Sequence, residues 1–177
     1  MLKFIGDLRS LLLALWLGAA CFFSFAVAPS AFSVLQAPDL AGAVVSRTLM
    51  IVNLSGIVIG AFLLLTSFLP GKSAKPALIW IERILLVILT IAGVVGQFVI
   101  GLAMSQIRLS VGRPIEELAA EDPSRLWFNQ LHQYSVYVLV TGMIAAGLSY
   151  FLLAYRARHT ENKPLKTTTK DIPEFKF

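Results

Sequence analysis

Four long apolar stretches, separated by short polar connectors, form the pattern of the sequence. They cover about residues 8–32, 43–69, 77–105 and 125–155. Each is long enough to cross a bilayer as a helix, which needs about 20 apolar residues. Because a chain in lipid must satisfy its backbone hydrogen bonds internally, these stretches predict helices rather than open strands. The pattern therefore predicts an all-α, integral membrane four-helix bundle over residues 1–157.

Proline residues and charges indicate where the helices begin and end. The first stretch starts like a secretory signal, but it is longer than the roughly 7–15 residues of a signal's apolar core, so we expect a retained helix. Pro29 lacks a backbone N–H and clashes with the preceding turn, which predicts a kink or an end nearby. Asp122 followed by Pro123 predicts a capped start for the fourth helix. The basic, polar residues 158–177 predict a disordered tail.

Two connectors differ in length and charge. Residues 70–76 hold two prolines, a glycine and two lysines, which together predict a loop. Residues 106–121 form the longest connector and carry both signs of charge. Within it, Pro114 followed by two glutamates predicts a short amphipathic helical turn at the membrane surface.

Small and polar residues follow one face of the later helices. Gly56 and Gly60 are four residues apart, a spacing that lets a second backbone approach closely. In the third stretch Gln97 lies between Gly93 and Gly101, four residues from each, on the same helix face. In the fourth, His132 and Ser135 share a face with small residues, and we expect that face to line the bundle interior.

Composition supports a membrane protein and narrows its chemistry. The chain is 57% hydrophobic and 14% charged, and its mean hydropathy is +0.78, which is too apolar for a soluble domain. The net charge of +5 comes from residues in the flanks and tail, where a membrane protein meets anionic lipid, so we expect no nucleic-acid partner. Cys21, the single cysteine, leaves no intrachain disulfide or thiolate metal cluster.

The distribution of basic residues predicts the orientation. With four spans, the side that holds both termini carries eleven Lys and Arg residues, and the other side carries four. The positive-inside rule then places both termini on the cytoplasmic side, and we expect the protein in the cell's inner (plasma) membrane. Glu82 and Arg83 lie on that side, at the membrane interface or paired with neighbours. The cytoplasmic halves of the helices are otherwise almost entirely Leu, Ile, Val and Ala.

Polar side chains of three helices are expected at one depth in the outward half. An ionisable group at membrane depth is a candidate functional residue, and His132 is the histidine inside an apolar stretch. Asn53, Gln97 and Ser135 should lie near it. Four residues could crown the cluster: Arg47, Gln106, Arg108 and Arg125. Two interpretations stay open, a small polar pocket that opens outward and a set of interhelical hydrogen bonds worth about 0.6–2 kcal/mol each.

The same residues suggest two cofactors. Copper(I) prefers soft ligands, which His132, Met104 and Met50 offer. Haem would find one axial ligand in His132 but no second membrane histidine, because His159 lies in the polar tail. Methionine at helical spacing is more often a core residue than a ligand. Ser135 lies one helical turn from His132, but no acidic residue joins them, so we name no catalytic residue and expect no enzyme.

Several segments resemble a known family. They are Ser24-Phe-Ala-Val-Ala-Pro-Ser-Ala-Phe-Ser-Val-Leu35, Ala41-Gly-Ala-Val-Val45, Gln106-Ile-Arg108, Asp122-Pro-Ser-Arg-Leu-Trp-Phe128 and Leu131-His-Gln-Tyr-Ser135. The chain resembles the bacterial membrane family labelled domain of unknown function 4149, which is similar to transmembrane protein 205. The resemblance implies a four-helix integral membrane protein without an established activity. A more distant likeness to CopD-type copper-resistance and HemJ-type membrane proteins implies copper or haem as ligands.

Two functions follow from these observations. We favour a structural or accessory factor of the lipid bilayer, in which the polar cluster around His132 fixes helix packing and a homo-oligomer or membrane-protein partner binds elsewhere. The alternative is a protein that binds or transports a small ligand, either copper, haem or a small solute. Its tentative ligand-binding residues are His132, Ser135, Gln97, Asn53 and Arg108, and its tentative metal ligands are His132 and Met104. A solute channel is a weaker third option, because four helices enclose little lumen.

Overall fold

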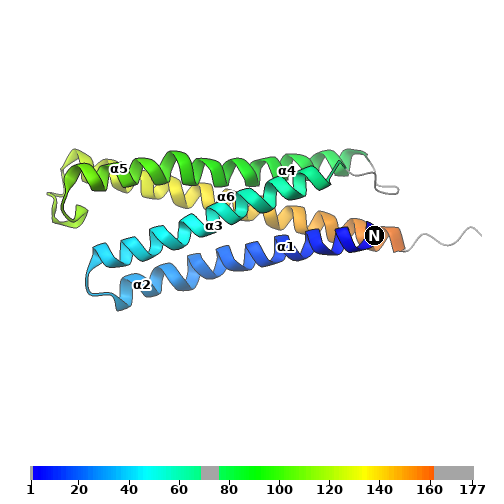
Figure 1. Ribbon diagram of the computed structural model, residues 1–177, viewed down its shortest axis with the longest axis horizontal. Helices are drawn as coiled ribbons and strands as arrows, with labels where there is room; N and C mark the ends of the chain where they lie inside the picture. The colour runs from blue at the N-terminus through cyan, green and yellow to red at the C-terminus, as the bar shows by residue number, and fades with distance from the viewer. Residues whose placement is uncertain (1, 69–75, 162–177) are drawn as a thin grey trace, which may run out of the picture.

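The computed structural model describes residues 2–68 and 76–161, and within them the regular structure is entirely helical (Figure 1). In chain order the elements are α1 Leu2–Phe22, the π-helix η1 Phe23–Val27, α2 Ala28–Val34, α3 Pro38–Thr66, α4 Pro76–Val94, the π-helix η2 Val95–Gly101, α5 Leu102–Val111, the 3-10 helix η3 Ile115–Glu117, and α6 Pro123–Glu161. The predicted all-α fold is confirmed. The predicted loop lies outside the described residues except for Pro76, which begins α4.

Apart from η3, these elements form four long helices. α1, η1 and α2 form one continuous helix, and α4, η2 and α5 form another. In the described part of the chain, four helices are long and apolar enough to cross a membrane: Phe4–Val34, Pro38–Thr66, Pro76–Val111 and Pro123–Arg156. Large apolar side chains such as Phe25, Leu65 and Phe151 are exposed on the outside of the bundle, as a bilayer environment requires. The predicted four membrane helices are therefore confirmed.

The first helix does not end at Pro29. It continues to Val34, and the π-helical turn η1 lies just before the proline. In this turn the Ala28 N–H donates to the Phe23 carbonyl, five residues back. A proline removes one α-helical hydrogen bond and crowds the preceding turn, and a widened turn accommodates both effects.

The start of α6 is capped as predicted, but its end lies further along the chain than expected. The Ser124 N–H donates to Oδ1 of Asp122 at 2.8 Å, so the aspartate satisfies one of the free amides of the first turn. At its other end α6 continues to Glu161. Residues 158–161 of the expected tail are therefore helical, and residues 162–177 lie outside the described part of the chain.

Glycines bring the helices into close contact in the middle of the bundle. A Cβ atom on Gly56 would lie 2.9 Å from Nε1 of Trp16, and one on Gly60 would lie 2.5 Å from Oγ1 of Thr90. The Trp16 indole N–H donates to the Val52 carbonyl at 3.0 Å, which joins α1 to α3. The Gly56–Gly60 spacing therefore serves helix packing.

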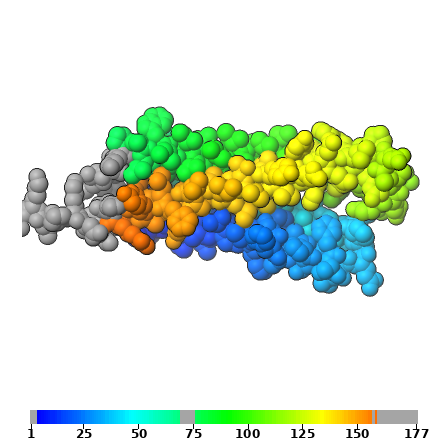
Figure 2. Space-filling view, turned by 180° about the vertical axis from the view of Figure 1, so that it is seen from behind, coloured from blue at the N-terminus to red at the C-terminus, as the bar shows by residue number. Residues whose placement is uncertain are grey.

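The bundle has two unlike ends. We call the end that holds the start of α1 and the last turns of α6 the terminal end, and the end that holds the connectors before α3 and α6 the distal end (Figure 1). The main packing pairs are α4 with α6, α3 with α4, and α1 with α6, whereas α2 packs mainly against α3 and η1. α6 lies along the space between α4–α5 and α1–α2 (Figure 2). α2 and α3 therefore diverge from α5 and α6 toward the distal end.

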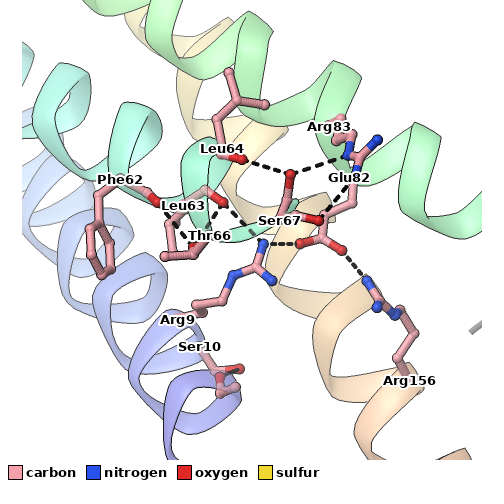
Figure 3. A network of polar contacts seen from close by, with 11 residues as sticks. Arg9, Ser10, Phe62, Leu63, Leu64, Thr66, Ser67, Glu82, Arg83 and Arg156 are labelled. Carbon is pink, nitrogen blue, oxygen red and sulfur yellow. Dashed lines mark hydrogen bonds and ion pairs between the residues drawn. The ribbon is translucent and has the colours of Figure 1, made fainter. Parts of the chain in front are cut away.

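A buried ion cluster joins three helices at the terminal end (Figure 3). Oε1 of Glu82 on α4 accepts a hydrogen bond from Nη2 of Arg9 on α1, and Oε2 accepts one from Nη1 of Arg156 on α6. Nη2 of Arg9 also donates to the Leu63 carbonyl of α3 at 3.2 Å. Glu82 is 1% exposed. This end of the bundle is held by paired charges.

This cluster decides between the two placements expected for Glu82, at the interface or paired with neighbours: Glu82 is buried and paired. Arg9 is buried as well, so the terminal halves of the helices are less purely apolar than expected. Neighbouring residues on a helix point about 100° apart, so Arg83 points away from Glu82. Its guanidinium instead donates to Oγ and the carbonyl of Ser67 and lies 4.0 Å from the Phe68 ring.

We predict that Glu82→Leu lowers the free energy of unfolding by about 3–5 kcal/mol, because it leaves the buried Arg9 without its counter-ion. Unfolding by sodium dodecyl sulfate in mixed micelles, followed by tryptophan fluorescence, measures this loss. Arg83→Leu is the matched control and should cost much less. The double variant Arg9→Leu with Glu82→Leu should recover part of the loss. Equal losses for Glu82→Leu and Arg83→Leu would contradict a buried ion pair.

Candidate functional site

A cavity of about 580 Å³ lies between the diverging helices of the distal end. Its walls come from α2 and α3 on one side and from η2, α5, η3 and α6 on the other. On one side of the cavity, α2 packs mainly against α3 and η1 and has little contact with α5 and α6 opposite. The divergence of the bundle therefore creates the cavity.

The structure brings the candidate site residues of the sequence together around this cavity. Its lining includes Asn53, Gln97, Met104, Arg108, His132 and Ser135, and also Met50 and Arg47. They come from α3, η2, α5 and α6. Their convergence on one cavity follows from the antiparallel order of the helices, which the hydrophobic pattern predicts. Their binding of a ligand or metal stays a prediction.

Asn53 and Ser135 are the most buried polar residues of the lining. Asn53 is 5% exposed and Ser135 is 7% exposed. Within residues 2–68 and 76–161, neither side chain forms a hydrogen bond to another residue, and neither is sealed into the protein core, because both line the cavity. Buried polar groups are nearly always hydrogen-bonded to protein or to water. The cavity must therefore supply the partner of both groups.

The π-helix η2 shapes the wall beside Asn53. Gly96 faces the amide so closely that a Cβ atom there would lie 3.1 Å from its Nδ2. A second glycine, Gly101, ends η2, and Gln97 between them also lines the cavity. π-helical turns are rare and occur often at functional sites. The two glycines leave room that a larger side chain would fill.

Interhelical hydrogen bonds do not explain the polar cluster. Across the described part of the chain, no hydrogen bond joins Asn53, Gln97, His132 and Ser135 to one another. His132 is an exposed lining residue on α6, one turn before Ser135. Of the two interpretations left open by the sequence, the pocket fits this geometry and the set of hydrogen bonds does not.

Arg108 forms part of the rim. Its Nη1 donates to Oγ of Ser46 at 3.1 Å, which bridges α5 and α3 across the cavity. Its guanidinium carbon lies 5.1 Å from the centre of the Phe128 ring. A Cβ atom on Gly42 would lie 3.0 Å from Nη2, so the guanidinium lies close against the α3 backbone. These contacts hold the charge of Arg108 at the cavity.

Arg125 does not crown the cluster, contrary to expectation. Its Nη1 donates to the carbonyl of Leu118 at 2.7 Å and to that of Glu116 at 3.3 Å. Arg125 therefore fixes the connector after η3, because free carbonyls at the end of a short helical turn attract a cation. Gln106 is exposed and does not belong to the lining.

The candidate metal ligands have mixed surroundings. His132, Met50 and Met104 line the same cavity. Met104, however, also packs against the buried apolar cluster formed by Ile115, Leu118 and Phe128. Among the described residues there is no group of three His, Cys, Asp or Glu side chains that could hold a metal ion. A metal would have to use thioethers beside a single imidazole.

Sequence reasoning missed three features of this end of the molecule. Glu116 and Asn129 line the cavity. Glu116 lies in a connector and Asn129 near the polar start of the fourth stretch, so hydropathy singled out neither. The π-helix η2 was also missed, although its two glycines five residues apart are a weak indication. At the other end, the burial of Glu82 follows from contacts across helices that spacing along one helix does not reveal.

The fold and the distal cavity define a multi-pass membrane protein with a polar site between its helices. Residues 11–112 match the family described as Domain of unknown function (DUF4149), and the chain belongs to this family. No curated protein and no solved structure matches the chain. The similarity to transmembrane protein 205 and to CopD-type and HemJ-type proteins stays a prediction.

We predict that Ser135→Ala leaves the free energy of unfolding nearly unchanged, because its hydroxyl has no hydrogen-bond partner to lose among residues 2–68 and 76–161. Trp16→Phe, which removes a hydrogen bond between α1 and α3, should cost about 1 kcal/mol. Both are measured by the same unfolding in sodium dodecyl sulfate. A loss for Ser135→Ala as large as that for Trp16→Phe would show that Ser135 serves packing.

Proposed function

We propose that this membrane protein binds a small molecule in the distal cavity. The observation that carries the proposal is the pair Asn53 and Ser135, an amide and a hydroxyl that are buried, face the cavity and have no protein partner among the described residues. Leaving such groups unpaired costs about 1–3 kcal/mol each. A ligand or an ordered water that supplies the missing hydrogen bonds removes this cost.

The size of the cavity supports the same proposal. Ligand sites have volumes of roughly 300–1,000 Å³ and are lined mainly by apolar side chains with a few placed polar groups. The distal cavity, at about 580 Å³, falls within this range, and apolar residues such as Leu49, Ile100 and Phe128 lie beside its polar ones. It also lies between helices of a bundle, where such sites are common.

The proposed orientation gives the cavity access from outside the cell. Both termini lie on the side that carries eleven of the fifteen Lys and Arg residues, which the positive-inside rule assigns to the cytoplasm. The distal end then faces away from the cytoplasm. In this proposal the protein resides in the inner (plasma) membrane and takes its ligand from the outer side or from the outer leaflet.

The structural role that we favoured from the sequence finds less support. Contacts between helices include the ion cluster of Glu82, the hydrogen bond from Trp16 to Val52 and the bond from Arg108 to Ser46. Within the described residues, the side chains of Asn53, Gln97, His132 and Ser135 form none of these contacts. These four residues are therefore not what joins the helices in this proposal. A second copy of the chain or a membrane-protein partner stays a prediction.

Filling the cavity tests the proposal. We predict that Ser135→Phe folds but loses the small molecules that purify with the wild-type protein in mild detergent. Thr141→Phe is the matched control, because Thr141 lies on the same helix and is exposed outside the cavity. Mass spectrometry of molecules released on denaturation, with circular dichroism as the check on folding, gives the readout. Identical released molecules from all three proteins would contradict the proposal.

The same preparation decides between a metal or haem and an organic ligand. Cells grown with copper and haem precursors supply both, and an absorption spectrum with elemental analysis detects them. A Soret band or near-stoichiometric copper that disappears in His132→Ala would identify the cofactor class. An organic molecule released from the wild type without metal would assign the cavity to a small solute or lipid-like ligand.

A further inference from the structure

The buried and half-buried arginines at the two ends of the bundle have different partners. At the terminal end, both Arg9 and Arg156 contact the carboxylate of Glu82. At the distal end, Arg108 is half-buried, yet its partners are a neutral hydroxyl and an aromatic ring. Within the described residues no carboxylate forms an ion pair with Arg108 or Arg47. A charge at membrane depth is costly and normally pairs with an opposite charge.

We propose that Arg108 binds the anionic head, a carboxylate or a phosphate, of an amphipathic molecule in the distal cavity. This inference rests on the proposed function. Arginine has five N–H donors in a planar fork that matches carboxylate and phosphate oxygens. One of them is bonded to Ser46, and the ring of Phe128 supports the guanidinium plane. The remaining donors are held in a fixed position, which lowers the entropy cost of binding.

The walls of the cavity accommodate the apolar part of such a molecule. Apolar lining residues include Phe32, Leu49, Ile100 and Leu102. Phe32 and Leu102 are each 52% exposed, so the cavity opens on a surface that faces the hydrocarbon of the bilayer. A ligand that enters from the membrane carries a hydrocarbon chain that these walls can bury. A small hydrophilic anion has no apolar part to bury against them.

The depth of the cavity fits a molecule with neutral polar atoms below its head. Ser46 and Asn53 are seven residues apart on α3, which corresponds to about 10 Å along the helix. Phe128, whose ring lies beside the guanidinium, and Ser135 are likewise seven residues apart on α6. The amide of Asn53 and the hydroxyl of Ser135 therefore lie well below the guanidinium. An ester, amide or hydroxyl group of the ligand, or water, completes their hydrogen bonds.

Arg83 offers a matched control for Arg108. It has the same kind of surroundings, since its guanidinium donates to a serine, Ser67, and lies over an aromatic ring, that of Phe68. Arg83 lies toward the opposite end of the bundle and does not line the distal cavity. If Arg108 only clamped two helices together, the two arginines would respond alike to substitution.

The test is equilibrium binding of radiolabelled dodecanoate to the full chain in phosphatidylcholine nanodiscs, corrected for empty nanodiscs. Dodecanoate and dodecyl phosphate should bind saturably, and the neutral dodecanol at least tenfold more weakly. Arg108→Gln should weaken dodecanoate binding at least tenfold, Arg108→Lys should weaken it less, and Arg83→Gln should leave it unchanged. Competition by phosphatidylglycerol in the nanodisc would identify a lipid head as the source of the anion, and competition by free acetate or phosphate a soluble one.

Two results would overturn the inference. Dodecanol binding as tightly as dodecanoate would show that the cavity has no preference for an anion, and this comparison needs no variant. Unchanged dodecanoate affinity in Arg108→Gln would show that another residue holds the head. If dodecanol binds and Ser135→Phe abolishes its binding, the inference fails while the proposed function stands. If no amphiphile binds saturably, the inference fails, and the purification of Ser135→Phe decides the proposed function separately.

Discussion

The buried contact of Glu82 with Arg9 and Arg156 is the constraint on which the arrangement of the bundle depends. It joins α4 to α1 and α6, and the bond from Arg9 to the Leu63 carbonyl adds α3. In a bilayer there is no hydrophobic drive between helices, so packing and polar contacts determine which ends stay together. Because these contacts lie at the terminal end, α2 and α3 diverge from α5 and α6 at the other.

The divergence turns a bundle with little internal space into one with a ligand-sized cavity. Glycines and the π-helix η2 keep the wall beside Asn53 free of bulky side chains. At the rim, the bond from Arg108 to Ser46 is the counterpart of the ion cluster, but one of its partners is neutral. The distal end is therefore held less strongly than the terminal end and leaves a charge available for a ligand.

The sequence predicts much of this fold because membrane helices have strong local signals. Long apolar stretches mark the four spans, and Asp122 with Pro123 marks the start of α6. The antiparallel order of the helices then places Asn53, Gln97 and His132 at one depth. The burial of Glu82 could not be predicted in the same way, since an acidic residue near a span end fits the interface equally well. Nor does spacing along the helices show whether Asn53, Gln97, His132 and Ser135 form hydrogen bonds with one another.

Accessibility of Ser135 tests the central claim, a polar cavity at the distal end, most directly. Ser135 and Ser149 are both buried serines on α6, but Ser135 lines the cavity and Ser149 is 0% exposed in the core. In a background with Cys21→Ala, Ser135→Cys should react with a small water-soluble methanethiosulfonate reagent while Ser149→Cys stays unmodified, as read by intact-protein mass spectrometry. Two equally unreactive cysteines would contradict the account.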